Sequence, residues 1–309
     1  MIPVNSVLQV GFFPDLMQAE IQHRLSPVSL LDPNAAVPAG DFNAILVRSN
    51  TTIPESLVRQ MPSLRLVATC GVGYDNLPLS YLKEHGIRAT NTPGVLNDAV
   101  CELAIGMLFG LIRQIPQSQA FLKSGAWSKG LLPLTTTLAG KKVGILGMGR
   151  IGQDLAKRLE PFKVEILYSG PSKKNVPYRY LPNLSELAQE SDVLFLVCPA
   201  SPATNKIINT QSLEALGPES YLINIARGSV VDEAALLYAL QHKRIAGAAL
   251  DVFDNEPNPN PEFFNLDNLL MTPHIGSSTA ETRVAMTKLA VDNLEAFFNQ
   301  QPLLTEVPN

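Results

Sequence analysis

A glycine-rich turn between a strand and a helix constrains the fold of this chain more than any other feature. The stretch Gly147-Met148-Gly149-Arg150-Ile151-Gly152 follows the β-branched run Val143–Leu146 and precedes the helical pattern QDLAKRLEP. In such a unit the first glycine allows a tight turn, the second lets backbone approach a pyrophosphate, and the third lets helix and strand pack closely. The pyrophosphate would lie at the helix N-terminus, where unpaired amides and the helix dipole favour anions. The sequence therefore predicts a dinucleotide-binding unit.

Short β-branched runs alternate with helical patterns in two blocks of the chain. The strands expected in the first block are Val7–Phe12, Val28–Leu31, Ala44–Val47, Leu66–Thr69 and Ile87–Thr90. Those expected in the second block are Val143–Leu146, Val164–Tyr168, Val193–Cys198, Tyr221–Ile225, Gly247–Asp251 and Leu269–Thr272. This alternation is typical of parallel sheets covered by helices. We therefore predict an α/β fold with two doubly wound parallel sheets.

Two helical segments are expected to join the blocks. The first is the apolar segment Asp98–Arg113, and the second is Thr279–Asn299, which follows the last strand. The most economical path for the second helix is a return to the first block. We therefore expect a discontinuous domain over residues 1–98 and 285–309, a second domain over 99–284, and a hinge at the two crossings.

The composition narrows the class of protein. Hydrophobic residues make up 46% and charged residues 17%, with a net charge of -4, which predicts a globular chain without a basic surface for nucleic acid or anionic membrane. Cys70, Cys101 and Cys198 lack metal-ligand spacing, so we expect buried thiols and no metal site. The N-terminus lacks a secretory pattern and the longest apolar run is too short to span a bilayer, which predicts a cytoplasmic location.

The segment after the second strand of the second block indicates which dinucleotide is preferred. An NAD site usually carries Asp or Glu about 20 residues beyond the glycines, where it binds the ribose 2′-hydroxyl. Here the segment reads YSGPSKK from Tyr168 and contains no carboxylate. Ser169, Ser172 and Lys173 could instead bind a 2′-phosphate, although the lysines could also belong to a solvated loop. We therefore predict that NADP(H) is preferred and that NAD(H) is the alternative.

Three stretches at the expected ends of strands carry candidate chemistry. They are Asn224–Gly228, Ala249–Phe253 with Glu256 beyond it, and Thr272–Gly276. Open α/β sheets bind ligands at the carboxyl ends of their strands. Arg227, Glu256 and His274 are therefore candidates for catalysis, and structural roles in ion pairs or at the surface are the alternative.

Taken together, these motifs resemble those of the D-2-hydroxyacid dehydrogenase family. The chain contains GMGRIG, INIARGSVVDEAAL, LDVFDNEP and TPHIG in that order. The stretches CGVGYD from Cys70 and TNTPG from Thr90 extend the resemblance over nearly the whole chain. The resemblance implies a Rossmann nucleotide-binding domain and a flavodoxin-like substrate domain.

The resemblance also implies roles for individual residues. Arg227 would bind the substrate carboxylate and keto oxygen, since a guanidinium offers a fixed fork of donors. His274 would protonate the carbonyl oxygen as hydride arrives at C2, and Glu256 would pair with its ring. Further substrate contacts would come from Ser49 and the amides of Val72 and Gly73. Further cofactor contacts would come from Cys198, Pro199, Ala226, Asp251 and Gly276, with strand capping the alternative for Asp251.

Within the family, the chain is most similar to the glyoxylate/hydroxypyruvate reductases. It lacks the extra length of phosphoglycerate dehydrogenases, and it has Glu256 where formate dehydrogenases have glutamine. We therefore predict NADPH-dependent reduction of glyoxylate or hydroxypyruvate to the D-2-hydroxy acid. An NAD-dependent D-lactate- or phosphoglycerate-type dehydrogenase is one alternative, with Arg48 the nearest basic residue for a phosphate. A nucleotide-sensing binding protein, like the C-terminal-binding corepressors, is another.

An assembly is also expected. Asp98–Arg113 is apolar on all sides, which exceeds what one domain face requires and predicts a homodimer interface. Trp127 either lines the substrate pocket of a neighbouring subunit or packs within its own chain.

Overall fold

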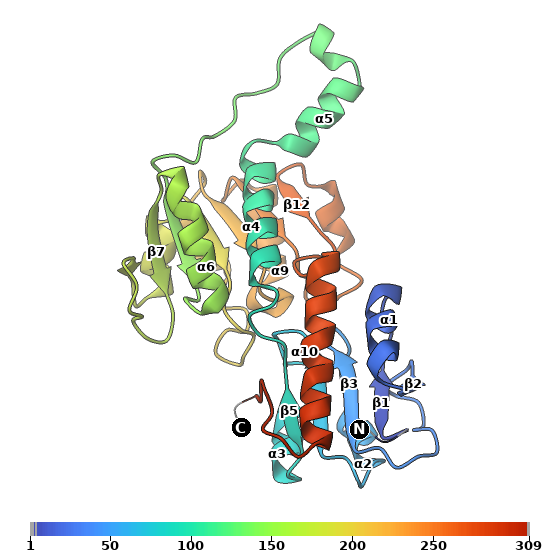
Figure 1. The fold of residues 1–309 in the computed structure, drawn as a ribbon. Helices are drawn as coiled ribbons and strands as arrows, with labels where there is room; N and C mark the ends of the chain where they lie inside the picture. The colour runs from blue at the N-terminus through green and yellow to red at the C-terminus, as the bar shows by residue number, and fades with distance from the viewer. Residues whose placement is uncertain (1–2, 4, 308–309) are drawn as a thin grey trace. The chain divides into compact units, whose positions relative to one another are not determined.

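In a computed structural model, which describes residues 3 and 5–307, the chain forms two compact α/β units (Figure 1). The first, called the N-terminal unit, comprises residues 1–96 and 277–309. The second, called the central unit, comprises residues 97–276. Each unit is built around its own parallel sheet.

The N-terminal unit contains a five-stranded sheet in the order β2-β1-β3-β4-β5. This is the flavodoxin-like strand order, as predicted. All of its ladders are parallel. The strands are β1 (Val7–Val10), β2 (Val28–Leu30), β3 (Ala44–Arg48), β4 (Leu66–Cys70) and β5 (Arg88–Thr90).

Helices cover both faces of this sheet, which is why its inner strands are continuous apolar runs. One face carries α1 (Asp15–Arg24) and α10 (Ala280–Phe298), and the other carries α2 (Glu55–Arg59) and α3 (Leu79–Glu84). Thr279 begins α10 by accepting a hydrogen bond from the Thr282 amide at 3.2 Å. The long helix therefore lies against β4 and beside α1, far in sequence from both.

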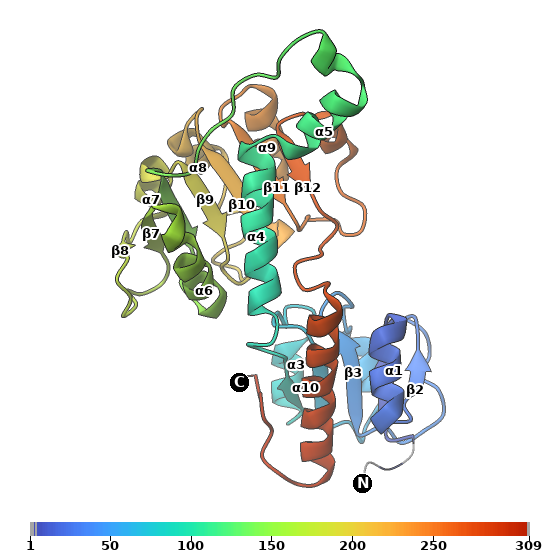
Figure 2. The same ribbon diagram turned by 45° about the horizontal axis from the view of Figure 1, so that its top comes forward.

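The central unit contains a seven-stranded sheet in the order β12-β11-β10-β9-β6-β7-β8, again with parallel ladders (Figure 2). The strands are β6 (Lys142–Leu146), β7 (Glu165–Ser169), β8 (Arg179–Tyr180), β9 (Val193–Leu196), β10 (Tyr221–Asn224), β11 (Gly247–Leu250) and β12 (Leu269–Met271). The helices are α4 (Asn97–Ile112), α5 (Ile115–Lys123), α6 (Arg150–Leu159), α7 (Leu184–Glu190), α8 (Thr210–Leu216) and α9 (Glu233–Gln241).

The two faces of this sheet have separate hydrophobic cores. Side chains of α4 and α6 pack on one face, and those of α7, α8 and α9 pack on the other. Among the described residues no single helix is both long and apolar enough to cross a membrane. In this part of the chain α4 and α5 taken together have the required length and composition, and they are bent by 55° at their junction.

The predicted α/β fold with two doubly wound parallel sheets is confirmed. Each expected strand is present, with ends that differ by a few residues. Strand β8 was not expected, because two residues are too short to show a hydrophobic period. Its partner is β7, where Leu167 pairs with Arg179 at the edge of the sheet. All three cysteines are buried and unpaired, as expected.

Candidate active site

The glycine turn lies where the direction of the strand order reverses. Strand β6 has β7 on one side and β9 on the other, and ligands of open α/β sheets bind outside this point. Gly147 has a φ of +106°, and a Cβ on it would lie 2.8 Å from Cys198 Cα. A Cβ on Gly152 would lie 2.1 Å from the Gly147 carbonyl oxygen, so α6 packs closely on the turn. A Cβ on Gly149 would meet nothing within 4 Å, which leaves open space beside the turn for a pyrophosphate.

The other residues of the glycine turn differ in how far their side chains are buried. Met148 is buried in the core beneath α6, and Ile151 is half-buried against the same core. Arg150 is the first residue of α6 and is exposed. Cys198 and Pro199 follow β9 directly opposite Gly147. The predicted nucleotide residues therefore surround one end of β6.

The loop after β7 folds beside the glycine turn. Ser169 is buried at the end of β7, and its carbonyl oxygen accepts a hydrogen bond from the Gly147 amide at 2.9 Å. The buried Tyr168 hydroxyl accepts one from the Lys174 amide at 2.8 Å, which fixes the path of the loop. Ser172 and Lys173 are exposed on it. Tyr168 was not among the predicted site residues, although a large aromatic at a strand end is a signal for such an anchor.

The loop after β10 presents Arg227. The fully buried Asn224 donates from Nδ2 to the Arg227 carbonyl oxygen at 2.9 Å and accepts from the Ala226 amide at 3.0 Å. Gly228 follows, where a Cβ would lie 1.9 Å from the carbonyl carbon of Phe253. The glycine therefore lets the loops after β10 and β11 approach each other, and Asn224 holds the turn that carries Arg227.

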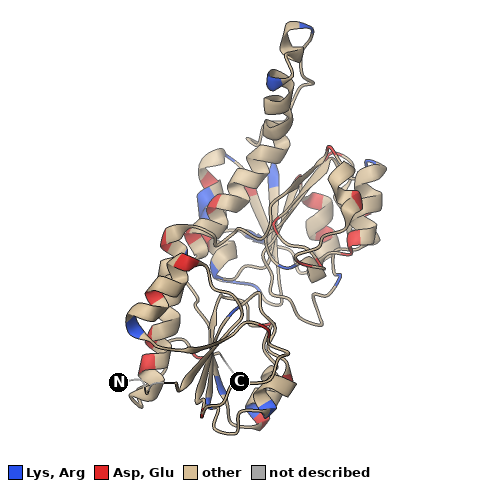
Figure 3. Ribbon diagram, turned by 90° about the vertical axis from the view of Figure 1, so that its right-hand side faces the viewer, with Lys and Arg blue, Asp and Glu red and all other residues tan. Residues whose placement is uncertain are grey.

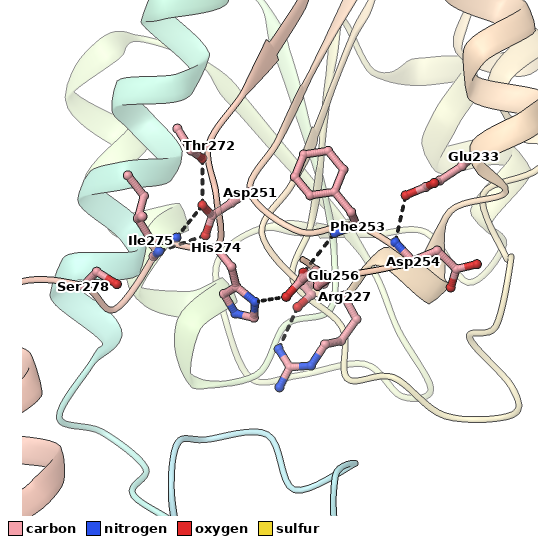
Figure 4. Close-up of polar contacts among 12 residues, drawn as sticks. Arg227, Glu233, Asp251, Phe253, Asp254, Glu256, Thr272, His274, Ile275 and Ser278 are labelled. Atoms are coloured by element: carbon pink, nitrogen blue, oxygen red, sulfur yellow. Dashed lines mark hydrogen bonds and ion pairs between the residues drawn. The ribbon is translucent and has the colours of Figure 1, made fainter. Parts of the chain in front are cut away.

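Glu256 and His274 contact each other directly, and Arg227 lies in the same region (Figure 4). His274 Nδ1 lies 2.7 Å from Glu256 Oε2, and the other carboxylate oxygen accepts from the Phe253 amide at 3.0 Å. Both side chains are about one-third exposed. Because Nδ1 faces the carboxylate, Nε2 is the ring nitrogen that can exchange a proton with a ligand.

The surroundings of Glu256 favour its ionised form. Burial by itself raises the pKa of this carboxyl group. The hydrogen bonds from the His274 ring and the Phe253 amide, with the charges of His274 and Arg227, outweigh burial and hold the pKa of Glu256 below its usual value. The carboxylate is therefore available to orient the histidine.

Asp251 anchors the loop that carries His274. Its carboxylate accepts hydrogen bonds from the Ile275 amide at 2.7 Å, the Gly276 amide at 2.8 Å and the Thr272 hydroxyl at 2.7 Å. Burial is the largest influence and raises the pKa of Asp251 despite these bonds. His274 has a φ of +51°, in the left-handed region that side chains other than glycine seldom adopt. The three hydrogen bonds offset the cost of this backbone conformation.

Three positioning residues lie inside the motifs but were not predicted as site residues. Besides Asn224, these are Thr272 and Glu233, whose Oε1 accepts from the Asp254 amide at 2.8 Å in the loop that carries Glu256. The sequence signal that they share is a polar side chain beside a buried strand or helix end. Such a residue must find a partner within the protein.

The predicted substrate residues of the N-terminal unit lie at the carboxyl edge of its sheet. Ser49 follows β3, and Val72 and Gly73 follow β4. The Ser49 amide donates to the Cys70 carbonyl oxygen at 3.2 Å, and a Cβ on Gly71 would lie 2.2 Å from Ser49 Oγ. The two loops are therefore in contact within this unit.

Comparisons with known proteins agree with this geometry. A family model described as "D-isomer specific 2-hydroxyacid dehydrogenase, NAD binding domain" matches residues 105–276. The chain is 44% identical to the hydroxyphenylpyruvate reductase of Plectranthus scutellarioides, over 88% of this chain and 87% of that protein. It is also 44% identical to a glyoxylate/hydroxypyruvate reductase of Arabidopsis thaliana, over 86% and 85% of the two chains.

A solved structure is similar over almost the whole chain. The NADPH-dependent glyoxylate/hydroxypyruvate reductase of Sinorhizobium meliloti, in complex with NADP and malonate, superposes with a TM-score of 0.94 at 38% identity. The match covers 99% of this chain and 97% of that one.

A glycine turn at the switch point of a parallel sheet, next to strand-end loops with an arginine and a paired histidine, defines a dinucleotide-dependent oxidoreductase. The family model and the relatives narrow this class. The chain belongs to the D-isomer specific 2-hydroxyacid dehydrogenase family, and the predicted enzyme class is confirmed.

The depressed pKa of Glu256 predicts how stability depends on pH. A carboxyl group whose pKa is lower in the folded protein stabilises it above the unfolded pKa, about 4.3, and loses this contribution as the pH falls through the folded pKa. We expect the difference in free energy of unfolding between wild type and Glu256→Gln to shrink as the pH falls from about 5.5 to about 3. Urea denaturation followed by circular dichroism measures it.

The matched control for this experiment is Glu214→Gln, which removes an exposed carboxylate from α8. We expect its difference from wild type to stay small throughout this range. Parallel pH curves for wild type and Glu256→Gln would contradict the proposed surroundings of Glu256.

Proposed function

We propose that this enzyme reduces small 2-oxo acids, glyoxylate and hydroxypyruvate among them, to D-2-hydroxy acids with NADPH. The observation that carries the proposal is the 2.7 Å contact between His274 Nδ1 and Glu256 Oε2, near Arg227. The names of the relatives from Arabidopsis thaliana and Sinorhizobium meliloti support this substrate class.

The reaction needs an anion anchor, a hydride and a proton. Arg227 binds the substrate carboxylate and polarises the keto oxygen, since its guanidinium offers several donors in one plane. When bound, the nicotinamide supplies the hydride that forms the new C–H bond at C2. His274 gives its Nε2 proton to the carbonyl oxygen, which becomes the hydroxyl, and takes it back in the reverse direction. Glu256 holds the ring through its contact with Nδ1, which leaves Nε2 for the substrate.

The central unit would hold the cofactor and the N-terminal unit would contribute to the substrate pocket. The amides from Gly147 to Gly152 would bind the pyrophosphate at the start of α6. Cys198, Pro199, Ala226, Asp251 and Gly276 would line the rest of the cofactor site. From the N-terminal unit, Ser49 and the amides of Val72 and Gly73 would bind the substrate. The two compact units support this division of roles.

Loss of the histidine tests the acid–base role. We expect rapid oxidation of NADPH by the wild type with glyoxylate or hydroxypyruvate, and a decrease of roughly 10²–10⁴-fold in kcat for His274→Ala, because the proton donor is removed. The absorbance of NADPH measures the rate. His23→Ala, an exposed histidine on α1, is the control and should retain full activity.

Two outcomes would change the proposal. Activity that survives in His274→Ala would remove the acid–base assignment. Turnover with hydroxyphenylpyruvate but with neither small acid would move the substrate to bulkier 2-oxo acids.

The preference for NADPH rests on the loop after β7. This loop lacks the carboxylate that would repel a 2′-phosphate, and it carries Ser172 and Lys173 on its exposed side. Ser169 ends β7 beside the glycine turn. A phosphate at this position would be bound by hydroxyl groups and an ammonium group.

Removal of the Ser172 hydroxyl and the Lys173 ammonium group should weaken the binding of NADPH but not that of NADH. We expect a Ser172→Ala/Lys173→Ala double variant to raise KM for NADPH by roughly tenfold or more, because charge-assisted bonds to the 2′-phosphate are lost. KM for NADH, which lacks this phosphate, should change little. Steady-state kinetics with both cofactors measure the effect. Lys157→Ala on the exposed side of α6 is the control. Equal changes for both cofactors would contradict the assignment.

A homodimer would account for the exposed apolar surface of the central unit. Helix α5 has no buried residue, and with the loop that follows it projects from the rest of the unit (Figure 1). Leu134 is 99% exposed, Leu131 86% and Trp127 66%, so much of the tryptophan surface is available to a second copy. Much of α4 is already buried in the unit, while Leu103, Ile105 and Phe109 remain half-buried on it. Exposed apolar surface of this kind marks interaction sites, and a second copy would cover it.

The projecting segment supplies the test of the dimer. We expect wild type to sediment as a dimer at micromolar concentration and Leu131→Ser/Leu134→Ser to sediment as a monomer, because polar side chains weaken an apolar interface. A Leu304→Ser variant, on an exposed leucine of the N-terminal unit, is the control. A monomeric wild type would overturn this assembly.

A cytoplasmic location and the absence of nucleic-acid or membrane partners complete the proposal. Cys70, Cys101 and Cys198 are unpaired thiols, which is typical of reducing compartments. Basic and acidic residues are interspersed along the ribbon (Figure 3), and the net charge is -4.

A further inference from the structure

Two consecutive peptide groups after β4 carry the amides that the proposed function assigns to the substrate. The Val72 amide belongs to the same peptide group as the Gly71 carbonyl, and the Gly73 amide belongs to the same group as the Val72 carbonyl. Neither peptide bond is cis. Because a trans peptide group is planar, its N–H and C=O point in opposite directions. A partner on each carbonyl oxygen therefore fixes the direction in which the amide behind it points.

Both carbonyl oxygens have such a partner in the loop after β5. The Thr92 amide donates to the Gly71 carbonyl oxygen at 2.8 Å, and Thr92 Oγ1 accepts from the Gly71 amide at 2.9 Å. Asn91 Nδ2 donates to the Val72 carbonyl oxygen at 2.8 Å. The Val72 and Gly73 amides themselves donate no hydrogen bond within the described part of the chain. The loop after β5 therefore orients two amides that are available to a ligand.

A segment that follows α10 holds Asn91 in turn. This return segment, residues 303–307, runs back beside β5, where Glu306 and Thr90 form an antiparallel bridge (Figure 1). The Asn91 amide donates to the Thr305 carbonyl oxygen at 3.2 Å, and Thr305 Oγ1 donates to the Asn91 carbonyl oxygen at 2.6 Å. Thr305 therefore fixes both backbone polar groups of Asn91.

The return segment is itself anchored by a buried asparagine and an ion pair. Asn293 of α10 is fully buried, and its Oδ1 accepts from the Leu304 amide at 3.0 Å and the Thr305 amide at 3.1 Å. Its Nδ2 donates to Thr305 Oγ1 at 2.8 Å. Arg88 and Glu306 contact each other through two hydrogen bonds of 2.7 Å. A buried network in which the polar groups have partners holds one geometry.

Stability of the fold does not require all of these contacts. The bridge at Glu306 and its ion pair with Arg88 cover the edge of the sheet beside β5. Val72, however, lies in a half-buried loop, and carbonyl groups of surface loops commonly bond to water. The side chain of Asn91 reaches this carbonyl from another loop. The effect specific to that bond is the direction of the Gly73 amide.

We propose that Asn91, Thr92 and Thr305 are positioning residues for the substrate carboxylate. Asn91 and Thr92 hold the two peptide groups whose amides bind the carboxylate, and Thr305 holds Asn91. Donors that are fixed before binding lose less conformational freedom when the substrate arrives. A hydrogen bond on the carbonyl oxygen also polarises the peptide group and strengthens its N–H as a donor. This inference rests on the proposed function, which assigns the Val72 and Gly73 amides to the substrate.

Substitution of Asn91 tests the positioning by kinetics. Asn91→Leu keeps the size and branching of the side chain but removes the donor to Val72. We expect KM for glyoxylate to rise by roughly tenfold, because the Gly73 amide is no longer held toward the carboxylate. We expect kcat and KM for NADPH to change less than about twofold, since the carboxylate is bound alike in the ground and transition states. Asn34→Leu, in the exposed loop after β2, is the matched control and should leave all three values unchanged.

A pair of variants at Thr305 tests the contribution of the return segment. Thr305→Val removes the hydroxyl group at nearly constant volume, whereas Thr305→Ser retains it. We expect Thr305→Val to raise KM for glyoxylate in the same way as Asn91→Leu, and Thr305→Ser to keep the KM of the wild type. A role in folding alone would lower Tm without a selective change in KM for the acid.

Thermal unfolding with oxamate supplies a readout without turnover. Oxamate has the carboxylate and the neighbouring carbonyl of a 2-oxo acid, and it is not reduced. With NADPH bound, we expect oxamate to raise Tm more in the wild type, Asn34→Leu and Thr305→Ser than in Asn91→Leu and Thr305→Val. The Tm values without oxamate establish that each variant folds.

The outcomes separate the possibilities. An unchanged KM for glyoxylate in Asn91→Leu, or equal increases in KM for glyoxylate and NADPH, would overturn the positioning role. An increase in Asn91→Leu without one in Thr305→Val would overturn the part assigned to Thr305. If no 2-oxo acid is reduced, the proposed function fails. An oxamate effect that depends on Asn91 would then still support the positioning of the amides, and no oxamate effect in the wild type would overturn it.

Discussion

The carboxyl ends of neighbouring parallel strands meet at one edge of a sheet, and the candidate site depends on this constraint. Strands β10, β11 and β12 are adjacent in the central sheet although nearly 50 residues separate the first from the last. Their loops therefore bring Arg227, Glu256 and His274 together without any contact that is local in sequence. The same edge carries the glycine turn after β6, so one edge of one sheet carries both the proposed pyrophosphate-binding turn and the proposed acid–base pair.

Close approach of these loops requires that side chains be absent at a few positions. A Cβ on Gly228 would lie 1.9 Å from the Phe253 carbonyl carbon in the neighbouring loop, and one on Gly152 would lie 2.1 Å from the Gly147 carbonyl oxygen in the glycine turn. Buried polar groups then hold the loops that have come together. Asn224 supports the turn at Arg227, and Asp251 binds two amides beyond His274. Their hydrogen bonds offset the cost of burying polar side chains and of the left-handed backbone at His274.

The charged side chains at the carboxyl edges of the two sheets are arranged differently in the two units. In the central unit the histidine has a carboxylate partner whose pKa is lowered by its surroundings. In the N-terminal unit Arg48 ends β3 without a carboxylate partner among the described residues, while Arg24 and Arg88 are paired. Partly buried charged groups without a partner occur at functional sites, where a ligand can supply the opposite charge. Such residues are retained for binding or catalysis even where they lower the stability of the fold.

The sequence by itself determined the α/β class, the positions of the strands and the motifs at their ends. Hydrophobic runs, glycines and strand-end polar residues are local features, and each follows from a physical requirement within a few residues of chain. Asn224, Glu233 and Thr272 are polar residues inside those motifs, and Asn224 binds residues of its own loop. The partners of Glu233 and Thr272, which are Asp254 and Asp251, lie on other segments and could not be assigned from the sequence. Only the tertiary structure decided that β8 pairs at the sheet edge, that the segment after α5 is exposed, and that Arg24 pairs with Glu295 of α10. Pairing between distant segments depends on how strands are ordered in a sheet and on which face each helix covers, and hydrophobic periodicity along the chain does not encode that order.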